Sequence, residues 1–515
     1  MGAETGRCPD ATSDFRQRDP HFPRHPGDVI GDDSKYEAVC SRDARFDGEF
    51  FFAVATTGIY CRPSCPATTP KRRNVRFYAT AAAAQGSGFR ACRRCRPDAV
   101  PGSAEWNARA DVVGRAMRLI ADGVVDREGV AGLAERLGYS ARQVQRQLSA
   151  ELGAGPIALA RAQRAHTART LLQTTAMPIT DIAFAAGFSS VRQFNDTVRD
   201  IYAVTPSELR AAAPGSTARF GSIAPASTAP GIALRLPFRG PYDAAAVFDY
   251  LEARAVTGVE EITGARGNRH YRRTLRLPHG LGVADVDEAL GDSWMACHLC
   301  LEDLRDLTTA THRMRRMFDL DADPRAVAEH LSGDPALAPL VAARPGLRAP
   351  GTADPHELAI RVVSGGRAAA TSLVQRYGTS LTVPRGTITH VFPSAAELAD
   401  APMTELCAER RRATRAVARA LMDGTVRLDP GADRNATEAA LACLPGVTAE
   451  MARYIRMRGL GDPDVLSTCD IVDQEAPERW DTAAWRPWRT YGVHHLAATR
   501  PAHVPVPRCA TPTEI

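Results

Sequence analysis

Apolar and polar residues are spaced differently along the chain, and these differences predict where strands and helices form. The segment EFFFAVATTGIYC, from Glu49 to Cys61, is rich in aromatic and β-branched residues, which favours strand. Residues 105–212 instead carry apolar residues at helical spacing. Residues 232–320 mix strand-like runs such as IALRLPF and YRRTLRLP with helical ones, and residues 325–500 return to helix with short loops. The pattern predicts a multidomain, mainly α protein with α+β parts.

The helical middle of the chain contains an internal repeat. LAERLGYSARQVQ (133–145) aligns with IAFAAGFSSVRQF (182–194) at an offset of 49 residues. Each copy has a helical apolar pattern, then a glycine and an aromatic residue, then a serine that can cap the next helix. A tight glycine turn between two short helices is typical of a helix-turn-helix, whose second helix enters the DNA major groove. An ordinary helical bundle is the alternative, but it does not explain the duplicated turn.

The second helix of each copy is therefore a candidate recognition helix, expected at Ser140–Leu148 and Ser190–Val198. We expect the first to bind DNA more strongly, because Asp196 and Asp200 oppose phosphate approach to the second. The candidate DNA-binding residues of the two helices are Arg142, Gln143, Arg146, Arg192 and Gln193.

Length and composition add limits to this picture. A chain of 515 residues is too long for one core, and 44% hydrophobic with 24% charged residues is typical of a soluble globular protein. No apolar run approaches the roughly 20 residues that a membrane span needs. The opening stretch lacks the apolar segment of a signal peptide, so we expect a disordered lead-in, a cytoplasmic protein and reduced cysteines. Residues 213–231, rich in Ala, Pro, Ser and Gly, predict a flexible linker.

Four cysteines have the spacing of a metal site. Cys61 and Cys65 are separated by three residues, and Cys92 and Cys95 by two. Four thiolates suit tetrahedral Zn²⁺, which could stabilise a domain too small to rely on its core alone. A zinc-bound thiolate stays deprotonated at neutral pH and remains a nucleophile if substrate reaches it. The remaining cysteines between the termini, Cys297, Cys300, Cys40, Cys407, Cys443 and Cys469, are expected to be buried apolar residues.

The cysteine segment is also strongly basic. From Cys61 to Pro97 the chain has nine Lys or Arg residues and no Asp or Glu. A four-thiolate zinc site would have a net charge of about −2, which these residues exceed. The excess predicts a surface that faces a polyanion such as DNA.

These motifs resemble known families. FAVATTGIYCRPSCPA, NVRFYA and GFRACRRCRPD resemble the amino-terminal domain of Ada, the bacterial response protein for DNA alkylation. The duplicated unit, with TPSELR after its second copy, resembles an AraC-type activator domain. PYDAAAVFDYLEARAVTGVEE, YRRTLRLPHG and RWDTAAWRPWRTYGVHHL resemble AlkA, a DNA-3-methyladenine glycosylase of the helix-hairpin-helix superfamily. The whole chain thus resembles an Ada–AlkA fusion.

The Ada resemblance implies that Cys61 takes a methyl group from a methyl phosphotriester in double-stranded DNA and is not regenerated. Methylation removes one negative charge from the site, which should strengthen DNA binding and activate transcription, with RNA polymerase as the partner. Arg62 is placed to meet a phosphate. Thr68 stands where the family often has a basic residue.

The AlkA resemblance implies that Asp470 is the carboxylate that stabilises an oxocarbenium-like sugar during base excision. Tyr454 would line the base pocket, and the hairpin LPGVT (444–448), including Gly446 and Thr448, would bind a DNA phosphate. The chain departs from the family at several places. Thr448 replaces a glycine at a position expected to want positive φ or close approach of a phosphate. Glu450 and Ala497 replace pocket tryptophans, and VVSGGRAAA (362–370) replaces a Gln-Gln probe.

Two functions therefore remain open. In one, the chain is both a methyl-acceptor regulator and a glycosylase of alkylated purines. In the other, it is a methylation-sensing transcription factor whose glycosylase half only binds DNA. The expected organisation is a lead-in (1–33), a zinc-binding methyl-acceptor domain with α/β structure (34–100), a double helix-turn-helix domain (105–212), a linker (213–231), an α+β domain (232–320), a helix-hairpin-helix domain (325–500) and a tail (501–515).

Overall fold

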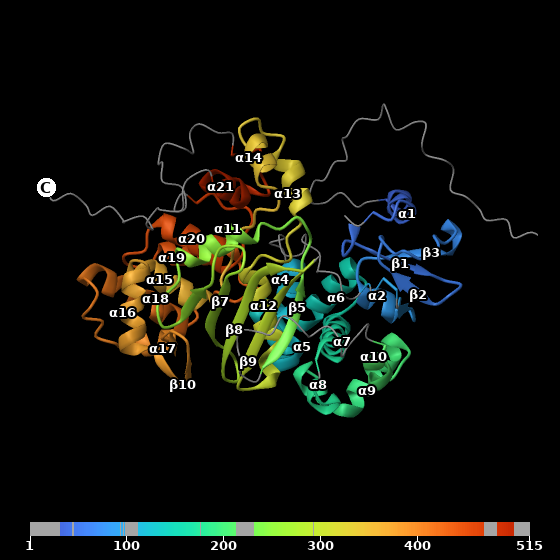
Figure 1. Ribbon diagram of the computed structural model, residues 1–515, viewed down its shortest axis with the longest axis horizontal. Helices are drawn as coiled ribbons and strands as arrows, with labels where there is room; N and C mark the ends of the chain where they lie inside the picture. Colours follow the sequence, from blue (N-terminus) through green and yellow to red (C-terminus); the bar gives the residue numbers. More distant parts are fainter. Residues whose placement is uncertain are drawn as a thin grey trace, which may run out of the picture.

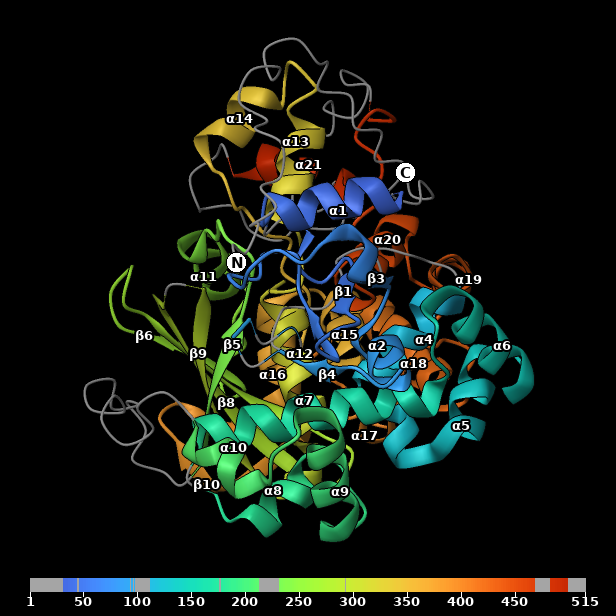
Figure 2. The ribbon, with the colours of Figure 1, turned by 90° about the vertical axis from the view of Figure 1, so that its right-hand side faces the viewer.

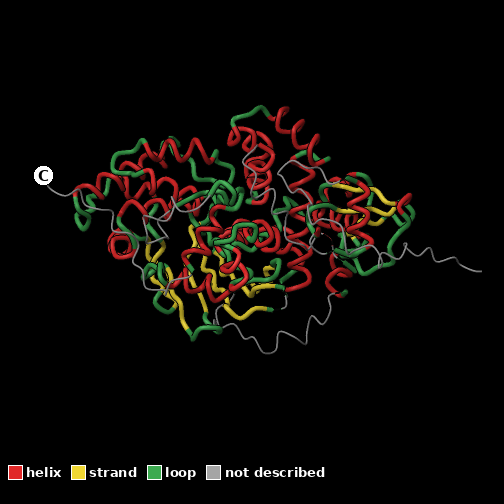
Figure 3. Tube along the Cα trace, turned by 90° about the horizontal axis from the view of Figure 1, so that it is seen from above, coloured by secondary structure: helices red, strands yellow, loops and turns green. Residues whose placement is uncertain are grey.

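The computed structural model describes the chain in segments: residues 31–43, 46–92, 94–95, 97, 112–175, 177–212, 231–291, 293–467 and 482–498. Almost all of the expected lead-in and linker, the whole expected tail and the candidate carboxylate Asp470 lie outside the described residues. Within them, three parts follow one another across the molecule: a small sheet at one end, a helical bundle beside it, and a larger sheet flanked by further helices (Figure 1). Figure 3 shows the two sheets at separate places.

The first part, here called the zinc module, is a four-stranded sheet in the order β3-β1-β2-β4. Alternation along β1 gives the sheet two apolar faces, since successive side chains point to opposite sides. Phe52 packs with the four candidate ligand cysteines, whereas Phe51 and Ala53 join a core that extends into the neighbouring helices. Its elements are α1 (Asp32–Cys40), β1 (Phe51–Val54), β2 (Ile59–Cys61), the 3-10 turn η2 (Arg72–Asn74), β3 (Val75–Tyr78), α2 (Ala81–Gly86) and β4 (Arg90–Ala91).

The second part consists of two helix-turn-helix units around the long helix α7, which passes beside α2 of the zinc module (Figure 2). The predicted serine caps are confirmed: the side chains of Ser140 and Ser190 accept the N–H groups of Gln143 and Gln193. The helices are α4 (Val112–Ala121), α5 (Val124–Leu137), α6 (Ala141–Leu152), α7 (Pro156–Thr174), α8 (Ile179–Ala185), α9 (Val191–Tyr202) and α10 (Pro206–Ala211).

The repeat has a single-residue insertion that the sequence alignment at offset 49 missed. The turn glycines Gly138 and Gly187 are 49 residues apart and both have positive φ, 77° and 86°. The capping serines Ser140 and Ser190 are 50 residues apart. The second turn therefore has one extra residue, Ser189, and the recognition helices align at an offset of 50.

The third part begins with a five-stranded antiparallel sheet in the order β5-β9-β8-β7-β6. The helix α11 covers one face, where Phe248 packs against Phe318 at a ring distance of 5.7 Å. Its elements are β5 (Ile232–Pro237), α11 (Ala244–Glu252), β6 (Glu260–Thr263), β7 (His270–Arg276), β8 (Leu281–Leu290), β9 (Trp294–Leu301), the 3-10 turn η4 (Leu304–Asp306) and α12 (Leu307–Met317).

The remaining helices confirm the predicted return to helix, with one exception. Residues 379–391 form a β-hairpin, because TSLTV and ITHV are rich in β-branched residues and Gly386 supplies positive φ (62°) at the turn. The elements are α13 (Pro324–Leu331), α14 (Ala338–Ala343), α15 (Pro355–Ser364), α16 (Arg367–Tyr377), β10 (Thr379–Arg385), β11 (Ile388–Val391), α17 (Ala395–Ala399), α18 (Ala408–Met422), α19 (Arg434–Ala442), α20 (Ala449–Gly459) and α21 (Arg489–Ala497).

The helix-turn-helix part is docked on this third part where α8 meets η4, where α7 meets β5, and where α4 meets α12 and the loop before α19. The guanidinium groups of Arg115 and Arg118 donate through Nε to the backbone carbonyl oxygens of Gly431 and Pro430, at 2.6 and 2.7 Å. The side chain of Leu119 lies over Gly431, where a Cβ would come within 2.4 Å of it. The contact is made by the loop that precedes α19. The hairpin 444–448 follows the other end of that helix.

The prediction that the other cysteines are buried is confirmed for Cys297 and Cys300, and it is wrong for Cys407 and Cys443, which are exposed. Cys40 is half-buried, and Cys469 lies outside the described residues. Cys407 is the N-cap residue of α18 and Cys443 the C-cap residue of α19, and such end positions face solvent here. Among the residues that the structure covers, no helix combines the length and apolarity that crossing a membrane would require.

Candidate metal centre and nucleic-acid interfaces

The four predicted ligand cysteines come together in the zinc module. Cys61 ends β2 and Cys92 directly follows β4, and the parallel pairing of these strands brings the two residues side by side. Cys65 lies in the turn after β2, where its N–H donates to the carbonyl of Arg62 at 3.0 Å. All four sulfurs lie within 4.8 Å of one another, and all four residues are buried.

This donor set fits zinc. Tetrahedral coordination at about 2.3 Å places the sulfurs about 3.8 Å apart, which is compatible with the observed spacing. Hydrogen bonds among the crowded thiols shift their acidity in opposite directions: the pKa of Cys65 is lowered to about 7, mainly by Cys61, while that of Cys61 is raised, mainly by Cys65. A divalent cation removes this competition, because it holds every sulfur as a thiolate.

A cleft of about 660 Å³ opens beside the cysteines. Cys61, Cys65 and Cys92 line it together with Arg90 and Arg94. The exposed fractions of the sulfur-bearing residues are 5% for Cys61, 4% for Cys65 and 8% for Cys92, so access does not single out Cys61. Cys92 lines the same cleft as Cys61, because the turn after β4 opens onto it.

The predicted phosphate contact Arg62 is engaged within the module. Its guanidinium lies 3.2 Å from the carboxylate of Asp47, which also accepts the hydroxyl of Ser64 at 2.5 Å. Burial raises the pKa of Asp47 against these stabilising contacts. Arg90 and Arg94 are exposed and line the cleft, so they are better placed to meet a phosphate than Arg62.

The two recognition helices present the predicted side chains to solvent: Arg142, Gln143, Arg146, Arg192 and Gln193 are all exposed. Asp200, expected to repel phosphates, is paired with Arg161 at 2.6 Å, and Asp196 lies 4.0 Å from Arg192. Within the described part of the chain Arg142 and Arg146 have no ion pair, and the ranking of the two helices stays a prediction.

The predicted hairpin lies between α19 and α20. Gly446 has φ of 78°, and a Cβ there would approach the Cβ of Ala413 to 2.9 Å, so glycine is required. Thr448 has φ of −81° and is the N-cap of α20, with its side chain accepting the N–H of Met451. The backbone at this position therefore does not need positive φ, and Thr448 serves as a helix cap.

Tyr454, on α20, lies in a polar cluster with Tyr250, on the helix α11 that covers the five-stranded sheet. Its hydroxyl is 3.1 Å from the hydroxyl of Tyr250, and Arg458 donates to it at 3.2 Å. Sequence reasoning missed Tyr250 and Arg458, although Tyr250 lies in the motif PYDAAAVFDYLEAR. Ser467, three residues before Asp470, donates to Glu450 at 2.8 Å. Glu450 thus contacts the last residue described before a gap in the structure.

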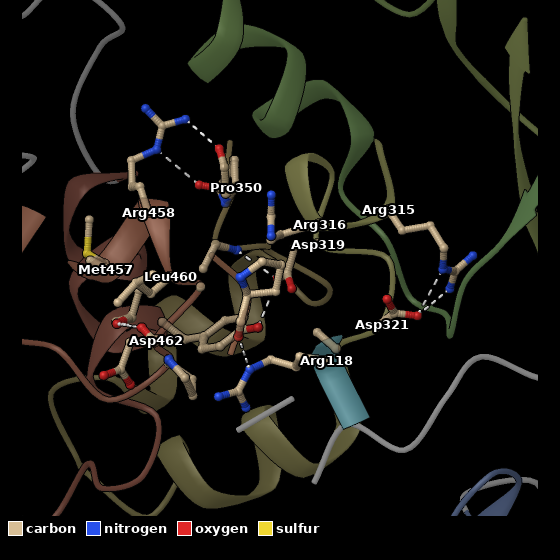
Figure 4. Close-up of a pocket in the computed structure, with 18 of the residues that line it drawn as sticks. Arg118, Arg315, Arg316, Asp319, Asp321, Pro350, Met457, Arg458, Leu460 and Asp462 are labelled. Atoms are coloured by element: carbon tan, nitrogen blue, oxygen red, sulfur yellow. Dashed lines mark hydrogen bonds and ion pairs between the residues drawn. The ribbon is translucent and has the colours of Figure 1, made fainter. Parts of the chain in front are cut away.

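A separate pocket of about 130 Å³ lies where α4 meets the third part (Figure 4). Arg118, Arg316, Asp319 and Asp462 line it, and Tyr454 does not. Burial raises the pKa of Asp319 to about 6, against the opposing effect of Arg348. This pocket lies at the seam between the two parts, and Arg458 of the Tyr454 cluster also lines it.

Comparison with known proteins finds three family matches along the chain. The chain matches the models of the metal binding domain of Ada at residues 34–98, a helix-turn-helix domain at 133–212 and the AlkA N-terminal domain at 233–354. It is 50% identical over 484 residues to the "Probable bifunctional transcriptional activator/DNA repair enzyme AlkA" of Mycobacterium tuberculosis, covering 90% of this chain and 95% of that protein.

Partial relatives match each half. The DNA-3-methyladenine glycosylase 2 of Escherichia coli is 29% identical over 280 residues, which is 51% of this chain and 95% of that enzyme. The refined structure of the DNA methyl phosphotriester repair domain of E. coli Ada is 54% identical, covering 14% of this chain and 76% of that domain, with a TM-score of 0.13. With a four-cysteine zinc-binding centre, a paired helix-turn-helix and half its sequence shared with a full-length relative, the chain belongs to the Ada–AlkA family of bifunctional transcriptional activators and DNA repair enzymes.

Proposed function

We propose that the zinc module accepts a methyl group irreversibly from a methyl phosphotriester in double-stranded DNA. The observation that carries the proposal is a buried four-cysteine centre that opens into a cleft lined by Arg90 and Arg94. A neutral phosphotriester flanked by ordinary phosphates would be drawn to these cations. Cys61 is the proposed acceptor, on the Ada resemblance.

The transfer balances without a further reactant. The sulfur of Cys61 bonds to the methyl carbon, the carbon–oxygen bond breaks, and the oxygen keeps the electron pair as a phosphodiester anion. Zinc, held by Cys61, Cys65, Cys92 and Cys95, supplies the chemistry that keeps the acceptor a thiolate at neutral pH. The thioether has no leaving group to return, so each chain reacts once.

Methylation would then act as the signal for transcription. Loss of one negative charge beside Arg90 and Arg94 strengthens attraction to DNA phosphates. The exposed side chains of α6 and α9 would read an operator sequence in the major groove. A bound activator of this kind would contact RNA polymerase.

For the third part we propose excision of alkylated purines such as 3-methyladenine, with Asp470 as the carboxylate. The leaving base is already cationic, so stabilising the sugar is the main requirement. The Tyr454–Tyr250–Arg458 cluster supplies an aromatic and polar wall, and the hairpin supplies backbone N–H groups for a phosphate.

The second candidate is a third part that binds DNA without excising bases. Glu450 and Ala497 favour it, since a carboxylate and a methyl group stand where the family has pocket tryptophans. Release of 3-methyladenine from alkylated DNA separates the two candidates, with Asp470→Asn as the control. Release that is absent from the parent chain, or equal in the variant, would favour the second.

The test of methyl transfer is peptide mass mapping after reaction with DNA that contains methyl phosphotriesters. The peptide with Cys61 should gain the mass of one CH₂, and Cys61→Ser should abolish the gain. A methyl on Cys65 or Cys92, which line the same cleft, would reassign the acceptor but keep the module's function.

A further inference from the structure

Both DNA-reading helices end against the zinc module. At the end of α6, the carbonyl oxygen of Leu152 accepts the hydroxyl of Thr80 at 3.1 Å, and a Cβ on its cap residue Gly153 would lie 3.1 Å from the Cβ of Ala83. At the end of α9, Tyr202 and its cap residue Ala203 line the cysteine cleft. Both helices touch the module, but only α9 reaches the cleft.

The two cap residues are equivalent in the repeat but differ in sequence. Gly153 and Ala203 are 50 residues apart and both have positive φ, 69° and 56°. Glycine adopts this conformation freely, whereas alanine does so at a cost. Ala203 is also exposed, so its methyl group forms part of the cleft wall rather than of a core.

The end of α9 and the cysteine centre line the same cleft. The C-terminus of a helix has a partial negative charge from its unpaired carbonyl groups. Four thiolates around a divalent cation have a net charge of −2, of which one unit is lost when a thiolate becomes a thioether. Arg90 and Arg94 line the same cleft and reduce the repulsion, so the effect of one unit of charge is modest.

We propose that the second helix-turn-helix unit senses methylation of the cysteine centre directly, through the last turn of α9 and its cap Ala203. Methylation relieves repulsion at this helix end and stabilises its last turn, which steadies the DNA-reading face of α9. This regulation rests on the proposed function, since it needs a methylated cysteine, but it does not depend on which DNA lesion donates the methyl group.

Hydrogen–deuterium exchange of the full chain with zinc bound tests the proposal. The protein is methylated with methyl iodide, whose carbon bonds to sulfur as iodide leaves, so the test stands even if phosphotriester transfer fails. Because Cys407 and Cys443 are exposed and would react, both are replaced by serine in every sample. Mass mapping confirms that a cleft cysteine has been methylated.

Amides at 199–204, the end of α9, should exchange about two- to fivefold more slowly after methylation, the range expected for one charge near a helix end. Amides at 149–154, the end of α6, are the internal control and should not change, because that end packs on α2 and does not line the cleft.

A pair of variants separates this local effect from net charge. Ala203→Lys places a cation at the cleft wall and should slow amide exchange at 199–204 before methylation. Methylation should then slow exchange at these amides by less than half as much as it does in the parent chain. Ser207→Lys adds the same charge at an exposed residue of α10 outside the cleft and should leave the effect intact. Unchanged exchange at 199–204 on methylation, equal changes at 149–154, or equal behaviour of the two variants would each overturn the proposal.

Discussion

The hydroxyl of Thr80 donates to the carbonyl oxygen of Leu152 at 3.1 Å and accepts the N–H of Ala83 at the same distance. One side chain therefore caps the start of α2 and holds the end of α6. A helix start and a helix end that face each other also have opposite partial charges, which favours the contact. The zinc module is thus joined to the first helix-turn-helix unit by a buried hydrogen bond as well as by apolar packing.

Replacing Thr80 with valine keeps the shape but removes both hydrogen bonds. We expect the free energy of unfolding to fall by about 1–2 kcal/mol, the usual cost of losing a cap. Chemical denaturation followed by circular dichroism measures it. Thr57→Val, at an exposed threonine of the same module, is the matched control and should change stability by less than about 0.5 kcal/mol.

Zinc should bind at one ion per chain. Metal analysis of the purified protein checks the ratio, and Cys92→Ala combined with Cys95→Ala should abolish binding, because two ligands cannot hold the tetrahedral ion. The double variant should also unfold the zinc module at lower denaturant concentration. Full zinc content in that variant would show that the metal lies elsewhere. Cys407→Ser with Cys443→Ser should retain all of it.

The first recognition helix should contribute more to operator affinity than the second. Arg142→Ala with Arg146→Ala should weaken binding at least tenfold, since a good contact between arginine and a base is worth about 1–3 kcal/mol. Arg192→Ala with Arg199→Ala should cost less, because Asp196 already partly neutralises Arg192. Titration at two salt concentrations measures both pairs. The opposite order of losses would refute the ranking.

Substitutions at Thr448 test whether this residue caps α20 or occupies a position that requires positive φ. As an N-cap it should cost about 1 kcal/mol when changed to alanine and only a few tenths when changed to glycine. A position that demanded positive φ would instead gain stability from Thr448→Gly. Thermal denaturation of the two variants decides, and stabilisation by glycine would contradict the capping geometry.

Asp319 should make stability depend on pH near neutrality. Its folded pKa of about 6 lies above its ordinary value of 3.8, so the folded state binds a proton more tightly than the unfolded state. The free energy of unfolding should therefore rise as pH falls from 8 through about 6. Asp319→Asn should remove this dependence and add at most about 3 kcal/mol at pH 8, at about 1.4 kcal/mol per pKa unit.

Asp321 provides the contrast on the same loop. Burial raises its pKa, but the guanidinium of Arg315 more than offsets this and holds the pKa below its usual range. Asp321→Asn should therefore destabilise the fold at neutral pH rather than stabilise it. Denaturation curves at pH 5 and 8 measure both variants, and a stabilised Asp321→Asn would contradict the assigned ion pair.

Local signals predicted much of the fold. The serine caps at Ser140 and Ser190, the turn glycines and the four-cysteine cluster all depend on residues close in sequence or on a fixed spacing, and the structure has each of them. The hairpin at 379–391 was missed although its β-branched residues signal strand, because the surrounding helical pattern dominated the interpretation.

Contacts between distant residues could not be predicted in the same way. Tyr250 and Tyr454 are 204 positions apart, and only the tertiary fold brings their hydroxyls, on α11 and α20, to 3.1 Å. Arg62 looked free in the sequence because the acidic residue that binds it, Asp47, precedes the basic segment. Access to each cysteine likewise depends on how α9 packs beside the zinc module, which no spacing of cysteines encodes.

The seam between α4 and the loop before α19 has a consequence for how the sequence can change over time. Arg115 and Arg118 bind backbone carbonyls, which every residue type supplies, so most side chains in this loop are free to vary without loss of the contact. Gly431 is the exception, because any side chain there would meet Leu119. Related chains that dock in this way should therefore keep the two arginines and this glycine while the rest of the loop diverges.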